Sequence, residues 1–274
     1  MRNILLVDFN NFWNRYFHAL VRNKKSTEEI NNFVVRIKEI LYNLNNSDHY
    51  NKIFLILDGN KGNESKKLIL ESYKGNRDTN KGIVYDLQRI VLRDFVLPTM
   101  PNLQVLRADE YEADHIVAIL AYNFANKGDQ VDIFSSDKDL LQVLSYSPNI
   151  HIGYKMAYST LVPLSMDEIL KKFKGVSHVG EIVKFRTFRG DPSDNIPPAI
   201  PRLPSRLIFT LIREVWHSPV LTAPILEAFA DFSPRIPRTS LPLIVRNWRL
   251  MYLPPTLPIP SLSLKRLKPN NNHV

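Results

Sequence analysis

Short apolar runs that end in an aspartate set the strongest constraint on the fold of this chain. Asn3–Asp8 (NILLVD) and Ile53–Asp58 (IFLILD) are continuous apolar segments of strand length. Such runs are typical of strands that are buried on both faces of a parallel sheet. Leu103–Leu106 and Val131–Phe134 are shorter candidate strands, the second followed by Ser135-Ser136-Asp137, and Asn149–Gly153 is a further candidate.

Amphipathic segments lie between these runs and predict helices. Apolar residues recur at helical spacing over Glu28–Leu44, Ile83–Val96 and Asp109–Asn126. Strands that alternate with helices predict an α/β fold with a mostly parallel sheet flanked by helices. The acids that follow the strands would then meet at the carboxyl edge of the sheet, where open α/β folds place their ligand sites.

The pattern changes near residue 165, after which helices alone are predicted. Met166–Phe173, His178–Phe188 and Leu241–Tyr252 have helical spacing. The last glycine is Gly190, and 14 of the 19 prolines lie at or beyond Pro197, so only short helices are expected there. We therefore expect an α/β core over 1–163 and a smaller helical region over 164–274 with a proline-rich C-terminal segment.

Charge and composition narrow the classes of partner. The net charge is +9, and residues 195–274 hold ten Lys/Arg against three acids, which favours a polyanion such as nucleic acid. Without cysteine, the chain has neither disulfides nor thiolate metal sites. Because no run approaches the roughly 18 apolar residues of a spanning helix, we expect no membrane partner and a cytoplasmic protein.

Acidic residues gather where the carboxyl edge of the sheet is expected. Any one of them could simply be a helix N-cap. Their recurrence after at least three strands favours a cation site instead, because carboxylates brought close together repel unless a cation neutralises them. Oxygen-only ligands suit Mg²⁺ or Mn²⁺, and two such ions could support hydrolysis of a phosphodiester. The candidate acids are Asp8, Asp58, those of the stretch Asp109-Glu110-Tyr111-Glu112-Ala113-Asp114, Asp137 with Asp139, and Asp191 with Asp194.

Six motifs occur along the chain in this order: Leu6-Val7-Asp8-Phe9-Asn10, Leu57-Asp58-Gly59, Tyr73-Lys74-Gly75-Asn76-Arg77, Tyr111-Glu112-Ala113-Asp114, Ser136-Asp137-Lys138-Asp139-Leu140-Leu141-Gln142 and Gly190-Asp191-Pro192-Ser193-Asp194-Asn195-Ile196-Pro197. In this order they resemble the motifs of the 5′-nucleases, the flap endonucleases and 5′→3′ exonucleases that include the nuclease domains of bacterial DNA polymerase I and bacteriophage enzymes. The resemblance covers about residues 3–200. It implies a PIN-like core with a helical arch (about 61–97), followed by a helix–three-turn–helix region.

The resemblance also implies roles for these residues. The enzyme would be a monomer that uses two Mg²⁺ ions, for which Mn²⁺ can substitute. It would hydrolyse DNA at 5′ ends, flaps or nicks, and RNA primers on DNA would be further substrates. The first-metal group would be Asp8, Asp58, Glu112 and Asp114, and the second Asp137, Asp139, Asp191 and Asp194. Tyr73, Lys74 and Arg77 would act in catalysis, and the ring of Tyr73 would stack on a terminal base. The same three residues, together with Lys81, would bind nucleic acid.

Two departures from the family pattern stand out. His115 occupies the fourth position of a stretch that is Glu-Ala-Asp-Asp in the family, which predicts weaker Mg²⁺ binding and a shift toward Mn²⁺. A purely structural role for His115 is the alternative. The family's glycine-rich hairpin, which holds a K⁺ ion, is replaced here by the glycine-free segment 198–205. The loss of the glycines argues against that K⁺ site. It also suggests that Arg202 and Arg206 contact phosphate through their side chains.

Two other functions remain open at this stage. The altered hairpin and His115 fit a nucleic-acid-binding protein with weakened catalysis. A PIN-type ribonuclease would share the core, but small ribonucleases of that type lack the arch and the Gly190–Pro197 motif.

Overall fold

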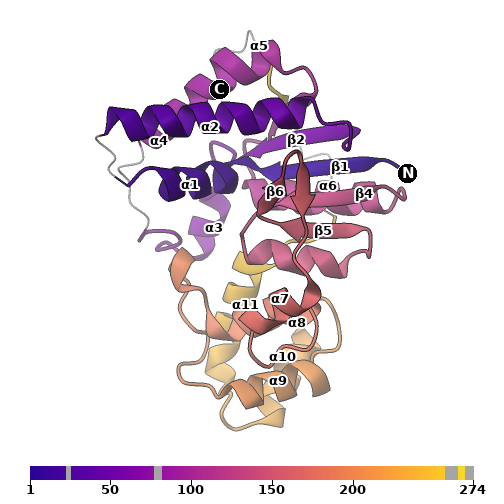
Figure 1. Cartoon of the computed structure of the whole chain (residues 1–274). Coiled ribbons are helices and arrows are strands. Elements are labelled where there is room, and N and C mark those ends of the chain that lie inside the picture. The colour runs from indigo at the N-terminus through magenta and orange to yellow at the C-terminus, as the bar shows by residue number, and fades with distance from the viewer. Residues whose placement is uncertain (23–25, 77–81, 257–264, 269–274) are drawn as a thin grey trace. The chain divides into compact units, whose positions relative to one another are not determined.

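The computed structural model describes residues 1–22, 26–76, 82–256 and 265–268 (Figure 1). These residues form two compact units. The first is drawn from Met1–Gly62, Asp78–Leu164 and Pro254–Val274, and the second from Asn63–Arg77 and Ser165–Leu253. The second unit thus includes a segment from within the first half of the sequence, and the first unit includes the C-terminal segment.

A six-stranded sheet forms the centre of the first unit. Its strand order is β5-β4-β1-β2-β3-β8, and all neighbouring pairs are parallel except β3 with β8. The predicted strands are all present, so the expected mostly parallel α/β sheet is confirmed. The strands are β1 (Asn3–Asp8), β2 (Lys52–Leu57), β3 (Leu103–Arg107), β4 (Gln130–Phe134), β5 (Ile150–Gly153) and β8 (Lys265–Arg266).

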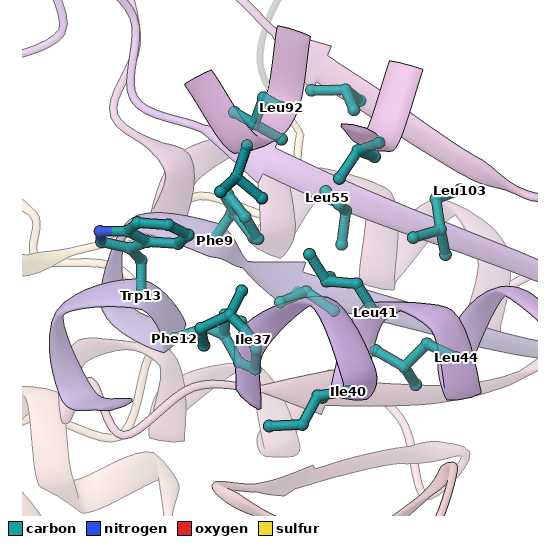
Figure 2. Packing of buried hydrophobic residues seen from close by; sticks show 14 of the residues in the cluster. Phe9, Phe12, Trp13, Ile37, Ile40, Leu41, Leu44, Leu55, Leu92 and Leu103 are labelled. Carbon is teal, nitrogen blue, oxygen red and sulfur yellow. The ribbon is translucent and has the colours of Figure 1, made fainter. Parts of the chain in front are cut away.

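Helices cover both faces of this sheet. On one face, α1 (Phe9–Leu20), α2 (Thr27–Asn45) and α4 (Gly82–Val91) share a core with the side chains of β1 and β2 (Figure 2). On the other face lies α6 (Ala113–Ala125), where Phe124 stacks on Phe54 of β2 at 5.6 Å between ring centroids. A π-helical turn (Leu92–Val96) and α5 (Leu97–Thr99) follow α4, and β6 (Lys155–Ala157) pairs with β7 (Thr160–Val162) in a hairpin.

The sequence did not predict α1, which packs an aromatic stripe into the core. Phe9, Phe12, Trp13 and Phe17 are each at most 1% exposed. The indole nitrogen of Trp13 donates to the carbonyl oxygen of Val84 at 3.0 Å, which ties α1 to α4. The position of α1 matters for function because the helix begins directly after Asp8, at the end of β1.

The predicted helix at Asp109–Asn126 begins four residues later than expected. The segment before α6 pairs instead with the loop after β2, because Gly59 N donates to Tyr111 O and Lys61 N donates to Asp109 O, both at 2.8 Å. A side chain at Gly59 would lie 2.2 Å from the carbonyl oxygen of Ala108, so only glycine permits this close approach. The later start makes Glu112 the N-cap of α6.

The second unit is helical, and the helices predicted after residue 165 are confirmed. Its core surrounds Trp216, whose ring centroid lies 4.9 Å from that of Trp248 and 5.8 Å from that of Phe229. Among the described residues, no helix is long and apolar enough to span a bilayer. The helices are α3 (Glu64–Ile69), α7 (Met166–Lys172), α8 (Gly180–Arg189), α9 (Ser205–Glu214), α10 (Ala223–Phe232) and α11 (Leu241–Met251).

An ion pair between the buried carboxylate of Glu181 and the half-exposed Arg213 joins α8 to α9 and predicts how the stability of the second unit depends on pH. Glu181, with its side chain 2% exposed, accepts hydrogen bonds from Arg213 Nε at 2.8 Å and from Ser177 N at 2.8 Å. Burial alone would raise the pKa of Glu181, but these hydrogen bonds outweigh it and lower the pKa from 4.5 to about 2. A lowered folded-state pKa stabilises the fold above the unfolded value, and this stability is lost as pH falls from about 4.5 toward 2.

We expect Arg213→Ala to destabilise the fold by roughly 2 kcal/mol at neutral pH, because it leaves a buried carboxylate without its cation. Chemical denaturation at pH 7 and pH 3 measures the effect, which should shrink at the lower pH. Arg36→Ala is the control, since Arg36 and its partner Glu39 are both more than half exposed. Equal losses in the two variants would contradict the role of the buried pair.

Candidate metal and nucleic-acid site

Asp8 lies where the strand order of the sheet reverses. The chain proceeds from β1 to β2 and β3 on one side, and then returns to β4 on the other side of β1. Open α/β sheets form a crevice at the carboxyl ends of the strands on either side of such a reversal. Asp8 Oδ1 caps α1 by accepting from Asn11 N at 3.2 Å, and its Oδ2 accepts from Ser135 Oγ, just after β4, at 3.1 Å.

The pKa of Asp8 shows that several predicted acids gather around it. The pKa of Asp8 is raised well above its usual value, and burial is the largest cause, since Asp8 is only 6% exposed. The negative charges of Asp58, Asp137 and Asp114 raise it further. Four carboxylates therefore lie close together, as the sequence predicts for a cation site. They come from the end of β1, from the segments after β2 and β4, and from the start of α6.

Asp58 connects the end of β2 to two helices. Its Oδ1 accepts from Ala113 N, the first residue of α6, at 2.8 Å, and its Oδ2 accepts from Asn10 Nδ2 at 2.6 Å. Part of its role is thus to satisfy the open N-terminal amide of α6, as an N-cap would. These bonds also fix the carboxylate at the edge of the sheet.

Asp137 and Asp139 follow β4 in a locally bonded turn. Asp137 N donates to Ser135 Oγ at 3.1 Å, and Asp139 N donates to Asp137 Oδ1 at 2.8 Å. Asp139 is 6% exposed and begins a 3₁₀ helix (Asp139–Ser145). Ser135 thereby contacts the carboxylate of Asp8 and the main-chain nitrogen of Asp137, which ties the turn after β4 to the end of β1.

Glu112, Asp114 and His115 form a tighter group at the start of α6. Each offers a ligand atom, and these atoms all lie within 4.8 Å of one another. Among the described residues, this is the one group of three or more acidic or histidine side chains that is so closely spaced. Asp114 Oδ1 accepts from His115 N at 2.7 Å and lies 2.9 Å from the ring Nδ1 of His115.

The chemistry of these side chains fits a divalent cation. Most of the possible ligand atoms are carboxylate oxygens, which Mg²⁺ and Mn²⁺ prefer, and one is an imidazole nitrogen. Besides burial, the negative charges of Asp58, Asp137 and Asp114 raise the pKa of Asp8, which means that these carboxylates repel it. A cation in contact with them would remove this repulsion.

Asp191 and Asp194 lie in the second unit and are held within it. The carboxylate of Asp191 accepts from Arg186 and, through Oδ1, from Ser193 Oγ at 2.6 Å. Asp194 Oδ2 accepts from the hydroxyl of Tyr73 at 3.4 Å. Their proposed part in a second metal site stays a prediction of the resemblance.

The segment around Tyr73 packs against the Gly190–Pro197 motif. Lys74 N donates to Asp194 O at 2.8 Å, and Asn195 Nδ2 donates to Ser72 O at 2.8 Å. Tyr73 is 1% exposed, with the ammonium group of Lys66 3.3 Å from its hydroxyl. Stacking on a terminal base needs an exposed ring, whereas here the ring packs in the core of the second unit. Arg77 and Lys81 lie outside the described residues.

The glycine-free segment keeps the turn that glycine would favour. Arg202 adopts a left-handed backbone conformation with φ of 59°, and both Arg202 and Arg206 are exposed. Asn247, fully buried in α11, donates to Pro197 O at 2.9 Å and to Thr187 O at 3.1 Å, which anchors the start of the segment. The two arginines are thus placed where phosphate could reach them.

Sequence reasoning missed the polar residues that support the acids. Asn10 binds Asp58, while Asn11 Oδ1 accepts from Ser136 N at 3.0 Å and Ser136 Oγ at 2.9 Å. Ser135 joins Asp8 to the turn after β4. Their signal in the sequence is proximity alone, since all four residues lie within three positions of Asp8 or Asp137.

We expect Asp8→Asn to raise the thermal midpoint of the metal-free protein by about 2–4 °C, because it removes one charge from a crowded group. Since the folded-state pKa of Asp8 is raised, the gain should appear as pH rises through that pKa and vanish at lower pH. Thermal unfolding in EDTA, with Glu39→Gln as an exposed control, measures it. A large loss of stability at neutral pH would contradict the crowding.

Tyr73→Ala should destabilise the fold by about 3–5 kcal/mol, because it empties a buried aromatic site. An exposed stacking residue would change stability by less than about 0.5 kcal/mol. Chemical denaturation distinguishes the two, with Tyr158→Ala as a control at a residue 95% exposed. A neutral Tyr73→Ala variant would show that the ring is exposed in solution.

Residues 3–174 match the model of the 5′–3′ exonuclease N-terminal resolvase-like domain. A 5′–3′ exonuclease of Buchnera aphidicola subsp. Schizaphis graminum is 29% identical over 216 residues, which are 77% of this chain and 70% of that protein. DNA polymerase I of Caldicellulosiruptor bescii is 25% identical over 197 residues, which are 71% of this chain but 22% of the polymerase.

Solved structures of a bacteriophage enzyme share the fold. The bacteriophage T5 flap endonuclease, in a complex with DNA and metal ions, matches with a TM-score of 0.63 at 18% identity, covering 95% of this chain and 92% of that one. The T5 5′-exonuclease with bound zinc matches equally well, with a TM-score of 0.63. At this identity the likeness shows the fold, and the PIN-like class expected from the sequence is confirmed. The domain model matches more than half of this chain, which therefore belongs to the 5′–3′ exonuclease family that carries the N-terminal resolvase-like domain.

Proposed function

We propose that this chain is a divalent-metal-dependent 5′-nuclease that hydrolyses phosphodiester bonds at or near the 5′ ends, flaps or nicks of DNA. The observation that carries the proposal is the crowding of Asp58, Asp114 and Asp137 around the buried Asp8, in a chain of the 5′–3′ exonuclease family. Clustered negative charge opposes phosphate binding, so a protein that only binds nucleic acid gains nothing from it. It is useful where a cation bridges protein and phosphate.

Asp8, Asp58, Glu112 and Asp114 would hold one Mg²⁺, and Asp137 and Asp139 would contribute to a second. When bound, such ions activate water and offset the charge that develops on the phosphate. The protein's own part is positional. Ser135, Asn10 and the backbone of α6 hold the carboxylates in place before a cation arrives. In the reaction, a water oxygen bonds to phosphorus while a P–O bond of the backbone breaks.

The DNA substrate is supported by the charge of the chain and by relatives of known structure. The T5 enzyme of the same fold was solved with DNA and metal ions. The net charge of +9 favours a polyanion. RNA primers on DNA remain an expectation from the resemblance, as does a monomeric enzyme.

We expect the purified chain to cleave an end-labelled 5′-flap duplex near the junction in Mg²⁺ or Mn²⁺ and not in EDTA. Asp137→Asn should reduce the rate at least 100-fold, since it removes a proposed ligand. Glu39→Gln, an exposed acid on α2, is the matched control and should leave the rate unchanged. DNA binding without cleavage in either metal would support the nucleic-acid-binding alternative and overturn the proposal.

We further expect Arg202→Ala/Arg206→Ala to weaken duplex binding and to lower the slope of log affinity against log salt by about 2, because each lost phosphate contact removes roughly one unit. Fluorescence anisotropy over a range of salt concentrations measures this in EDTA, which prevents cleavage. Arg36→Ala on α2 is the control. An unchanged slope would mean that these arginines do not contact the duplex.

A further inference from the structure

His115 stands at the closest gathering of metal-ligating side chains in the described part of the chain. Its ligand atom and those of Glu112 and Asp114 lie within 4.8 Å of one another at the start of α6. The side chain of His115 is 15% exposed, so the ring is held against the protein and not free in solvent. A histidine packed in this way beside two carboxylates needs a reason beyond solubility.

The contacts of the ring determine which nitrogen can bind a cation. Ring Nδ1 lies 2.9 Å from Asp114 Oδ1, and the same oxygen accepts from the main-chain nitrogen of His115 at 2.7 Å. A carboxylate can only accept hydrogen bonds, so Nδ1 carries the proton in this contact. In the neutral ring, the lone pair is then on Nε2.

This arrangement is the one that proteins use to orient a metal-binding histidine. Such histidines donate the hydrogen of their other ring nitrogen to a carboxylate, which fixes the tautomer and makes the ligand more basic. Asp114 meets this requirement for His115. Its second contact, to the main-chain nitrogen, fixes the carboxylate relative to the backbone that carries the ring.

We propose that His115 Nε2 is a ligand of the cation held by Glu112 and that the site therefore prefers Mn²⁺ and similar transition-metal ions over Mg²⁺. In this arrangement Asp114 orients the ring from its other side, in place of the direct metal contact that the family pattern gives to Asp114. Imidazole nitrogen is a poor ligand for Mg²⁺ and a good one for transition metals. The proposal rests on the proposed function in one respect, namely that a divalent cation binds at this edge of the sheet.

A spectroscopic test reads the ligand directly and needs no activity. The full-length protein is loaded with half an equivalent of Mn²⁺, and pulsed electron paramagnetic resonance is used to detect coupling of the electron spin to ¹⁴N. We expect a ¹⁴N coupling in the wild type that is absent from both His115→Gln and His115→Asp. His151→Gln, at a half-exposed histidine on β5, is the matched control and should retain it.

Competition between metals gives a second readout. Mg²⁺ is titrated against bound Mn²⁺, and we expect His115→Asp to shift the ratio of the two dissociation constants at least tenfold toward Mg²⁺, because an oxygen ligand replaces nitrogen. Circular dichroism of each variant verifies that it is folded. The use of two variants, one neutral and one negatively charged, ensures that a folding defect in one does not hide the result.

Each outcome decides the proposal. A wild-type signal without ¹⁴N coupling, a coupling that persists in both variants, an unchanged metal ratio, or no binding of Mn²⁺ would overturn it. The flap assay separates this failure from that of the proposed function. If the chain cleaves the flap with a divalent cation while bound Mn²⁺ shows no nitrogen ligand, the proposed nuclease function is supported and the proposed role of His115 is wrong.

Discussion

Electrostatic repulsion among the carboxylates around Asp8 is the constraint on which the functional edge of the sheet depends. Four acids from separate parts of the sequence are brought close enough to raise the pKa of the buried one. A fold holds such a group only if other interactions compensate, and here the parallel ladder of β1 with β2 and β4 and the aromatic core under α1 do so. Local hydrogen bonds from Ser135, Asn10 and Asn11 then fix the orientation of the carboxylates.

The sequence predicted the part of this arrangement that depends on periodicity. Apolar runs of strand length predicted every central strand, and the acids that end the first two runs placed Asp8 and Asp58 at the carboxyl edge. It did not predict α1, although Phe9, Phe12, Trp13 and Phe17 have helical spacing, because the helix propensity of aromatic residues is modest and tertiary packing decides. It also put the start of α6 too early, since the pairing of 109–111 with the loop after β2 is a long-range interaction.

The second unit illustrates why motif residues do not by themselves reveal their roles. Tyr73 was expected to stack on a base, yet its ring is buried and its hydroxyl contacts Asp194. Lys66, which no motif marks, contributes a buried ammonium group to the same network. A sequence shows that an aromatic and an acid are present, but only the packing shows that one supports the other.

The central claim is that the carboxylates at this edge form a metal centre, and the location of bound metal tests it most directly. Crystals of the full-length protein soaked in Mn²⁺ would be measured for anomalous scattering. We expect an anomalous peak in contact with Glu112 or with the carboxylates around Asp8. An ordered site with no anomalous density there at millimolar Mn²⁺, or density confined to another part of the molecule, would contradict it.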